Sequence, residues 1–238
     1  MNKYILAPVF LVSVIVSWLI WTNSPEYIRQ GGPLLVLGLT ILFLALTFAT
    51  ERFVVLYRTG GRGSVTQFVG GLKQSVRAGD IAQALDICKR QGGSIANVIG
   101  AGLQRYQHEK PSTADRKELL AETRRAIEEA NALEAPHLEQ NLTALSTIAS
   151  IATLIGLLGT TIGMIRAFRA MSHAGAPDAT QLALGISEAL VNTALGLFTA
   201  IFGTVLYNYF TQRVDRFRAQ VEETAFEVLQ LLELRKES

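Results

Sequence analysis

The chain has 238 residues, of which 49% are hydrophobic and only 18% are charged, with a formal net charge of +2 and a mean hydropathy of +0.28. This is more apolar than a water-soluble core of that size requires. The apolar residues fall into long runs separated by one charged block, which argues against a soluble α domain and predicts an all-α, multi-pass membrane protein. The single cysteine, Cys88, excludes an internal disulfide.

Two apolar runs open the chain. Residues 4–21 are long enough to cross a bilayer, which takes about 20 residues. A retained helix is favoured over a cleaved signal peptide because no small-x-small cleavage site follows. The residues leave open whether this run spans, lies on the membrane or is removed. We assign 1–33 to an N-terminal hydrophobic helix with an external loop and 34–58 to a membrane helix, whose Arg52 and Arg58 are expected to snorkel toward water.

A polar block, 59–141, predicts a helical domain outside the membrane. Its opening TGGRGS reads as a hinge, and three short amphipathic helices follow, broken at Gly79 and at Gly92-Gly93. Ser112 is the candidate N-cap of a further charged helix. We expect that helix to continue, kinked near Pro136, into the next membrane run.

The second half of the chain carries membrane helices at 142–168 and 182–210, joined by a loop at 169–181 and followed by an amphipathic helix at 211–238. Lys and Arg are dense in the polar block and in the tail but sparse in the loops. The positive-inside rule therefore places the large loop and the C-terminus in the cytoplasm.

Glu188 lies inside the last apolar run, six residues after Leu182 and about 9 Å along a helix. An acid in such a segment costs on the order of 2.5 kcal/mol and must be hydrated, paired or protonated. No cation in the membrane runs is obviously placed to pair with it. A hydrated pathway between copies arranged in a ring is therefore the interpretation we favour.

Small and hydroxyl residues recur at helical spacing in the last two runs, and such faces either pack helices closely or line a wet passage. We interpret Thr160 and Thr193, with Glu188, as functional. Residues that either line the pore or only pack helices are Thr153, Asn192, Thr199, Gly156, Gly159, Gly163 and Gly196.

Three stretches resemble the MotA/TolQ/ExbB proton-channel family: ERFVVLY from Glu51, IGLLGTTIGMIRAF from Ile155, and GISEALVNTALGL from Gly185 with the YNYF that ends at Phe210. The acid favours the ExbB/TolQ branch over the flagellar-motor branch. The chain departs from the family in having Thr153 and Phe202 where proline is frequent, and in its extra first run.

The resemblance implies a homopentameric ring in a Gram-negative inner membrane, with 169–181 in the periplasm. It implies a single-span ExbD/TolR-like partner that carries a membrane aspartate, and a TonB-like transducer that the proton motive force drives. Thr160 and Thr193 would lie near that aspartate and Glu188 would belong to the proton path.

Other functions are disfavoured. The chain shows no nucleophile, paired catalytic acids, metal cluster or cofactor loop, so we expect no enzyme activity, metal or cofactor, and its basic residues are interleaved with acids, which disfavours nucleic-acid binding. The alternatives are a TolQ-type envelope motor, a gliding or flagellar stator, and a non-conducting scaffold. The cargo, the stoichiometry, the rotation mechanism and the role of His173 stay open.

Overall fold

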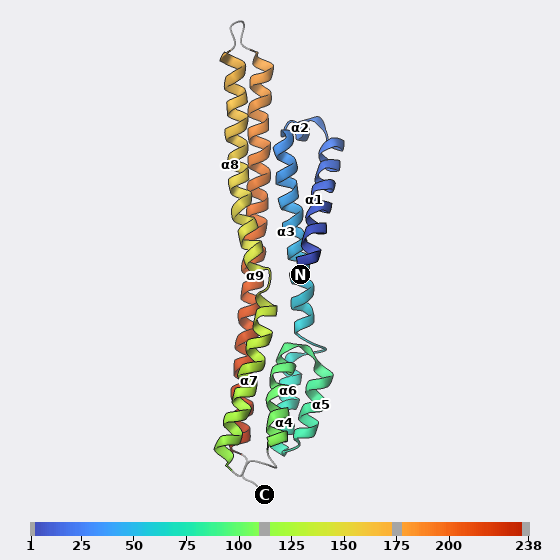
Figure 1. Ribbon diagram of the computed structural model, residues 1–238, viewed down its shortest axis with the longest axis vertical. Helices are drawn as coiled ribbons and strands as arrows, with labels where there is room; N and C mark the ends of the chain where they lie inside the picture. Colours follow the sequence, from blue (N-terminus) through green and yellow to red (C-terminus); the bar gives the residue numbers. More distant parts are fainter. Residues whose placement is uncertain (1–2, 110–114, 173–177, 235–238) are drawn as a thin grey trace. The chain divides into compact units, whose positions relative to one another are not determined.

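The computed structural model describes residues 3–109, 115–172 and 178–234, and in these ranges it is helical without a strand (Figure 1). This confirms the all-α prediction. The helices are α1 (Lys3–Asn23), α2 (Glu26–Arg29), α3 (Gly32–Thr59), α4 (Val65–Ala78), α5 (Ile81–Gln91), α6 (Gly93–Glu109), α7 (Arg116–Glu139), α8 (Leu142–Ser172) and α9 (Ala179–Leu234).

Three helical stretches of the described chain are long and apolar enough to cross a membrane: Gly32–Thr59, Arg116–Ser172 and Ala179–Leu234. They contain the second, third and fourth apolar runs. The first run forms α1, whose stretch Ala7–Asn23 is apolar but shorter. Its Phe10, Trp18 and other large apolar side chains are exposed, while Ser13 and Ser17 are buried.

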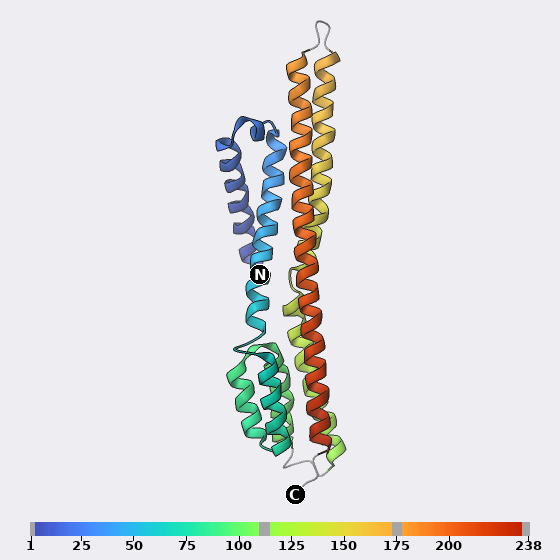
Figure 2. The ribbon, with the colours of Figure 1, turned by 180° about the vertical axis from the view of Figure 1, so that it is seen from behind.

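The chain divides into two compact units. The first contains the described residues up to Arg52 together with Asn141–Phe210. Within it α8 and α9 run antiparallel, side by side in both views (Figures 1 and 2). Both helices pass without a break through Thr153 and Phe202, the two positions that depart from the family pattern described above.

The second unit contains the described residues of Phe53–Gln140 and the chain from Thr211 on. Its core is built from α4 to α7 and from the last part of α9, which contributes Val221, Ala225, Val228 and Leu232. The sequence predicts an amphipathic helix at 211–238, and in its described part the apolar face is buried in the core of the helical domain.

Glycines mark the ends of two helices in this unit. Gly79 is left-handed (φ 81°) directly after α4, and α5 ends before Gly92 while α6 begins at Gly93, so the helix breaks fall at the expected glycines. The segment expected to be a hinge forms two hydrogen bonds with Gln91. The backbone N–H of Arg62 donates to the Gln91 carbonyl at 2.7 Å, and Gln91 Nε2 donates to the Gly60 carbonyl at 3.1 Å.

The prediction of one long helix that is kinked at Pro136 and continues into the membrane is wrong in one respect. Pro136 lies inside α7, and the chain leaves the helix at Gln140 and Asn141, the latter with φ 65°. Asparagine tolerates this left-handed conformation, and here its Nδ2 donates to Glu51 Oε2 at 2.9 Å. Ser112 lies outside the described residues, and α7 is capped by Asp115, which accepts from the Lys117 backbone N–H.

Arg52 does not snorkel. Its side chain is 1% exposed, and it donates from Nη2 to Glu51 Oε1 at 2.9 Å and from Nε to Glu51 Oε2 at 3.1 Å. The adjacent carboxylate thus neutralises the guanidinium. Arg58, further along α3, is exposed as expected.

Cys88 provides a test of the second unit. Burial of its thiol among apolar side chains raises its pKa to about 12, and only the thiolate reacts with maleimides. We expect the native protein at pH 8 to be labelled at least about a hundredfold more slowly than the denatured chain, in which the pKa is about 8.5. The pKa of Cys88 is higher in the folded than in the unfolded chain. The contribution of the buried thiol to the free energy of unfolding is therefore complete below about pH 8.5 and is lost as the pH rises toward 12.

The control is Cys88→Ser, which must remove all labelling. Fast labelling of the native chain at pH 8 would contradict this account of the core.

Candidate functional site

Glycines set the distance between α8 and α9. A Cβ on Gly156 would lie 3.3 Å from the Gly196 Cα, and one on Gly163 would lie 2.6 Å from the Gly185 carbonyl oxygen. A Cβ on Gly159 would overlap the Asn192 side chain. In the first unit, then, these glycines serve close helix packing, which brings polar groups of both helices together.

Glu188 is bonded to a cation from the neighbouring helix. Arg166 Nη1, on α8, donates to both carboxylate oxygens of Glu188 at 2.5 Å. The Glu188 side chain is 7% exposed and that of Arg166 is 51% exposed. The sequence-based statement that no membrane cation is placed to pair with Glu188 is therefore wrong.

The turn from α2 into α3 covers another side of Glu188. Gly32, the first residue of α3, has φ 67°, and a Cβ there would overlap Glu188 Oε1. Asn192 Nδ2 donates to the Gly31 carbonyl at 2.8 Å, and the Ser187 hydroxyl donates to Gln30 Oε1 at 2.7 Å. Gln30, Gly31 and Gly32 thus contact neighbouring residues of α9 around the Glu188 carboxylate.

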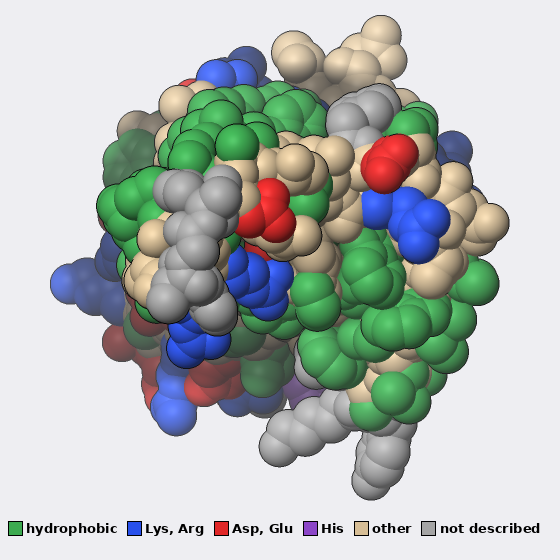
Figure 3. All heavy atoms as spheres, turned by 90° about the horizontal axis from the view of Figure 1, so that it is seen from above, with side chains coloured by type: hydrophobic (Ala, Val, Ile, Leu, Met, Phe, Trp, Pro, Cys, Tyr) green, Lys and Arg blue, Asp and Glu red, His purple; other side chains and the backbone are tan. Residues whose placement is uncertain are grey.

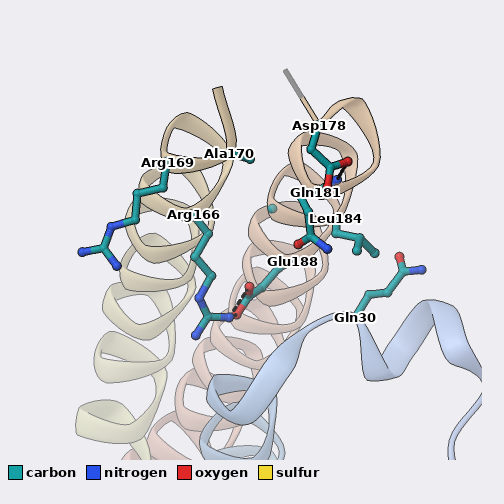
Figure 4. Close-up of a pocket in the computed structure, with 9 residues that line it drawn as sticks. Gln30, Arg166, Arg169, Ala170, Asp178, Gln181, Leu184 and Glu188 are labelled. Carbon is teal, nitrogen blue, oxygen red and sulfur yellow. Dashed lines mark hydrogen bonds and ion pairs between the residues drawn. The ribbon is translucent and has the colours of Figure 1, made fainter. Parts of the chain in front are cut away.

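A pocket of about 690 Å³ opens beside this pair. In Figure 4, Arg166 points from α8 toward Glu188, whereas Arg169 points away from it. Figure 3 shows this end of the molecule from above, where acidic and basic side chains lie next to one another among hydrophobic ones. The pocket is lined by Gln30, Arg166, Arg169, Ala170, Asp178, Gln181, Leu184, Gly185 and Glu188.

The two threonines that the sequence groups with Glu188 lie elsewhere on the helix pair. The Thr193 hydroxyl donates to the Ala189 carbonyl at 2.9 Å and across to the Gly156 carbonyl at 3.1 Å, and the Thr160 hydroxyl donates to the Leu157 carbonyl at 2.7 Å. Glu188 and Thr193 are five residues apart, so their side chains leave α9 about 140° apart. Within one copy the structure does not bring them together.

The remaining candidates divide in the same way. Asn192 and Thr199 are buried, at 4% and 1% exposed, on the Glu188 side of α9, and Thr199 donates to the Leu195 carbonyl. Thr153 lies seven residues before Thr160, about 20° from it around α8, and is half-buried. His173 lies outside the described residues.

Sequence reasoning placed Arg166 only two residues before the end of the 142–168 run and did not pair it with Glu188, whereas α8 continues to Ser172 and holds Arg166 within the helix pair. One signal was available. In a helical hairpin, residues at similar distances from the connecting loop lie at similar depth; Arg166 precedes the end of α8 by six residues, and Glu188 follows the start of α9 by nine. Asp178 caps α9 by accepting from the backbone N–H groups of Thr180 and Gln181.

Known proteins are similar to the part of the chain that contains Arg166 and Glu188. The family model described as the MotA/TolQ/ExbB proton channel family matches residues 92–223, more than half of the chain. The chain belongs to the MotA/TolQ/ExbB family. Arg166 and Glu188 lie inside the matched range, while the turn at Gly32 lies outside it.

Relatives of the chain carry ExbB and TolQ names. An ExbB homologue of Methanothermobacter thermautotrophicus is 30% identical over 80% of this chain and 63% of its own length. The biopolymer transport protein ExbB of Pseudomonas putida is 25% identical over 71% of this chain and 51% of its own. The Tol-Pal system protein TolQ of Pseudomonas aeruginosa is 27% identical over 76% and 80%. The chain thus spans about half to two thirds of the ExbB relatives named here.

A substitution at Gly32 tests the geometry around Glu188. Gly32→Ala places a Cβ against the Glu188 carboxylate at a left-handed φ, a conformation that costs a non-glycine residue about 1 to 2 kcal/mol. We expect the melting temperature of the detergent-solubilised protein to fall by several degrees, about 2 to 4 °C per kcal/mol.

Gly38→Ala is the matched control in the same helix. Its Cβ would meet only the tip of the flexible Leu195 side chain, so the melting temperature should change little. Equal losses in the two variants would show that the turn does not confine Glu188.

Proposed function

We propose that this chain is a proton-channel subunit of an inner-membrane motor that converts the proton motive force into mechanical work. The observation that carries the proposal is the 7% exposed Glu188 carboxylate, paired with Arg166 inside two apolar helices and open to a polar pocket. Acids at such positions are costly and mark ion pathways. Membership of the MotA/TolQ/ExbB family supports the same function.

The chain would act as a ring, with five copies expected. The hydroxyls of Thr153, Thr160 and Thr193 favour one flank of the α8–α9 pair as the pore wall. On α8, Thr160 lies about 40° to one side of Gly156, which faces α9, while Arg166 lies about 80° to the other side, toward α3. A pore on the threonine flank would leave α3 on the outside of the ring, toward lipid.

Partners follow from this function. The pore would hold the membrane helix of an ExbD/TolR-like protein whose aspartate carries the proton, and the moving complex would act on a TonB-like protein that spans the periplasm. The large loop and the C-terminus would be cytoplasmic. A TolQ-type envelope motor is the second candidate, because the TolQ of Pseudomonas aeruginosa aligns with 76% of the chain.

The test uses the full chain purified with an ExbD/TolR-like single-span protein from the same organism. In proteoliposomes we expect proton flux driven by an imposed membrane potential, which supplies about 2.3 kcal/mol per charge and 100 mV. Glu188→Gln should reduce the flux by about tenfold or more, and Thr160→Val and Thr193→Val should reduce it several-fold, because the pathway loses polar groups.

Thr161→Val is the matched control, since the Thr161 hydroxyl bonds the same Leu157 carbonyl as Thr160 but is exposed on a different face of α8. Its flux should equal that of the wild type. If Thr160→Val and Thr161→Val reduced the proton flux equally, the assignment of the threonine flank to the pore wall would be wrong. A wild-type complex without proton flux would leave the non-conducting scaffold as the function.

A further inference from the structure

Arg166 joins a buried carboxylate to an open pocket. One nitrogen, Nη1, contacts both oxygens of Glu188, while the side chain as a whole is 51% exposed and lines the pocket. Glu188 itself is 7% exposed. The guanidinium and the carboxylate thus both border the space from which water would reach them.

The other sides of Glu188 are closed. Gly32 leaves no room for even a Cβ beside Oε1, and the Asn192 side chain bridges the Glu188 carbonyl, at 2.9 Å, and the Gly31 carbonyl. The charged groups of the described chain that face the pocket are Arg166, Arg169, Asp178 and Glu188, and of these Arg166 bonds the Glu188 carboxylate. Gln30, from the α2–α3 turn, is neutral.

The chemistry of the pair follows from this enclosure. A buried carboxylate without a partner takes up a proton and becomes neutral, whereas one paired with a permanently charged guanidinium stays ionised. Because the Arg166 side chain is half exposed, its guanidinium keeps part of its hydration. The pocket also has room for this side chain to turn away from Glu188. An ionised carboxylate accepts a proton; one that is already neutral does not.

We propose that Arg166 is the positioning residue of this site: it holds Glu188 as a carboxylate at the floor of the pocket and thereby enables proton exchange between pocket water and Glu188. This rests on the proposed proton-channel function. In the step, a hydronium ion in the pocket gives its proton to a Glu188 oxygen and becomes water, while Arg166 stays protonated and faces the pocket. The reverse step returns the carboxylate to Arg166.

The experiment compares Arg166→Gln and Arg166→Lys in the full chain, reconstituted with the same ExbD/TolR-like protein. A lysine keeps the charge and a single donor nitrogen, which is all that Nη1 supplies here. We expect proton flux to fall by about tenfold or more in Arg166→Gln, a factor that corresponds to about 1.4 kcal/mol, and by less than about threefold in Arg166→Lys.

A spectroscopic readout is independent of flux. In infrared spectra of the chain alone, the difference between Arg166→Gln and the wild type should show the C=O stretch of a protonated carboxylic acid, and the differences for Arg166→Lys and for the Arg166→Gln/Glu188→Gln double variant should lack this band. The control is Arg124→Gln, which removes a guanidinium from the exposed pair with Glu128 and should change neither readout.

The outcomes separate the two hypotheses. If the wild type shows no flux, the proposed function fails, and the infrared band still decides the role of Arg166. If the wild type conducts and Arg166→Gln conducts equally, or lacks the band, the positioning role is wrong. Equal loss in Arg166→Lys and Arg166→Gln would also overturn it.

Loss of folding has its own test. In the Glu188→Gln background Arg166 has no carboxylate to position, so the double variant should melt at the temperature of Glu188→Gln alone. If Arg166→Gln lowers the melting temperature equally in both backgrounds, Arg166 contributes only packing and the proposal is wrong.

Discussion

A carboxylate inside an apolar helix pair is the constraint on which the first unit depends. Glu188 costs several kcal/mol in such a place unless a cation and hydrogen-bond donors surround it. Arg166 supplies the charge, and the turn at Gly32 encloses the carboxylate without touching it with a side chain. Three segments far apart in the chain thus meet around one buried carboxyl group.

Close approach of α8 and α9 makes that pairing feasible. Gly156 and Gly196 let the two backbones come almost into contact, so a side chain of ordinary length reaches across the pair. Larger residues at these positions would separate the helices and leave the carboxylate without its partner. The small-residue stripes of this family member therefore have an electrostatic consequence as well as a packing one.

Local signals in the chain predict much of this molecule. The long apolar runs predict α3, α8 and α9, and Gly79 and Gly92 mark the ends of α4 and α5 because glycine adopts left-handed conformations at no steric cost. Glu188 stands out from sequence alone, since an acid in an apolar run is rare. These features are determined by residues adjacent in the chain, or one helical turn apart.

The sequence by itself determined the helix class, the membrane runs and the anomalous acid, because hydrophobicity and helical periodicity act locally. Only the tertiary structure decided which groups meet. It buried Arg52 against Glu51, packed the end of α9 into the helical domain, and brought Arg166 to Glu188 while turning Thr193 to another flank. Such pairings depend on how helices rotate and how closely they pack, which spacing along one chain does not encode.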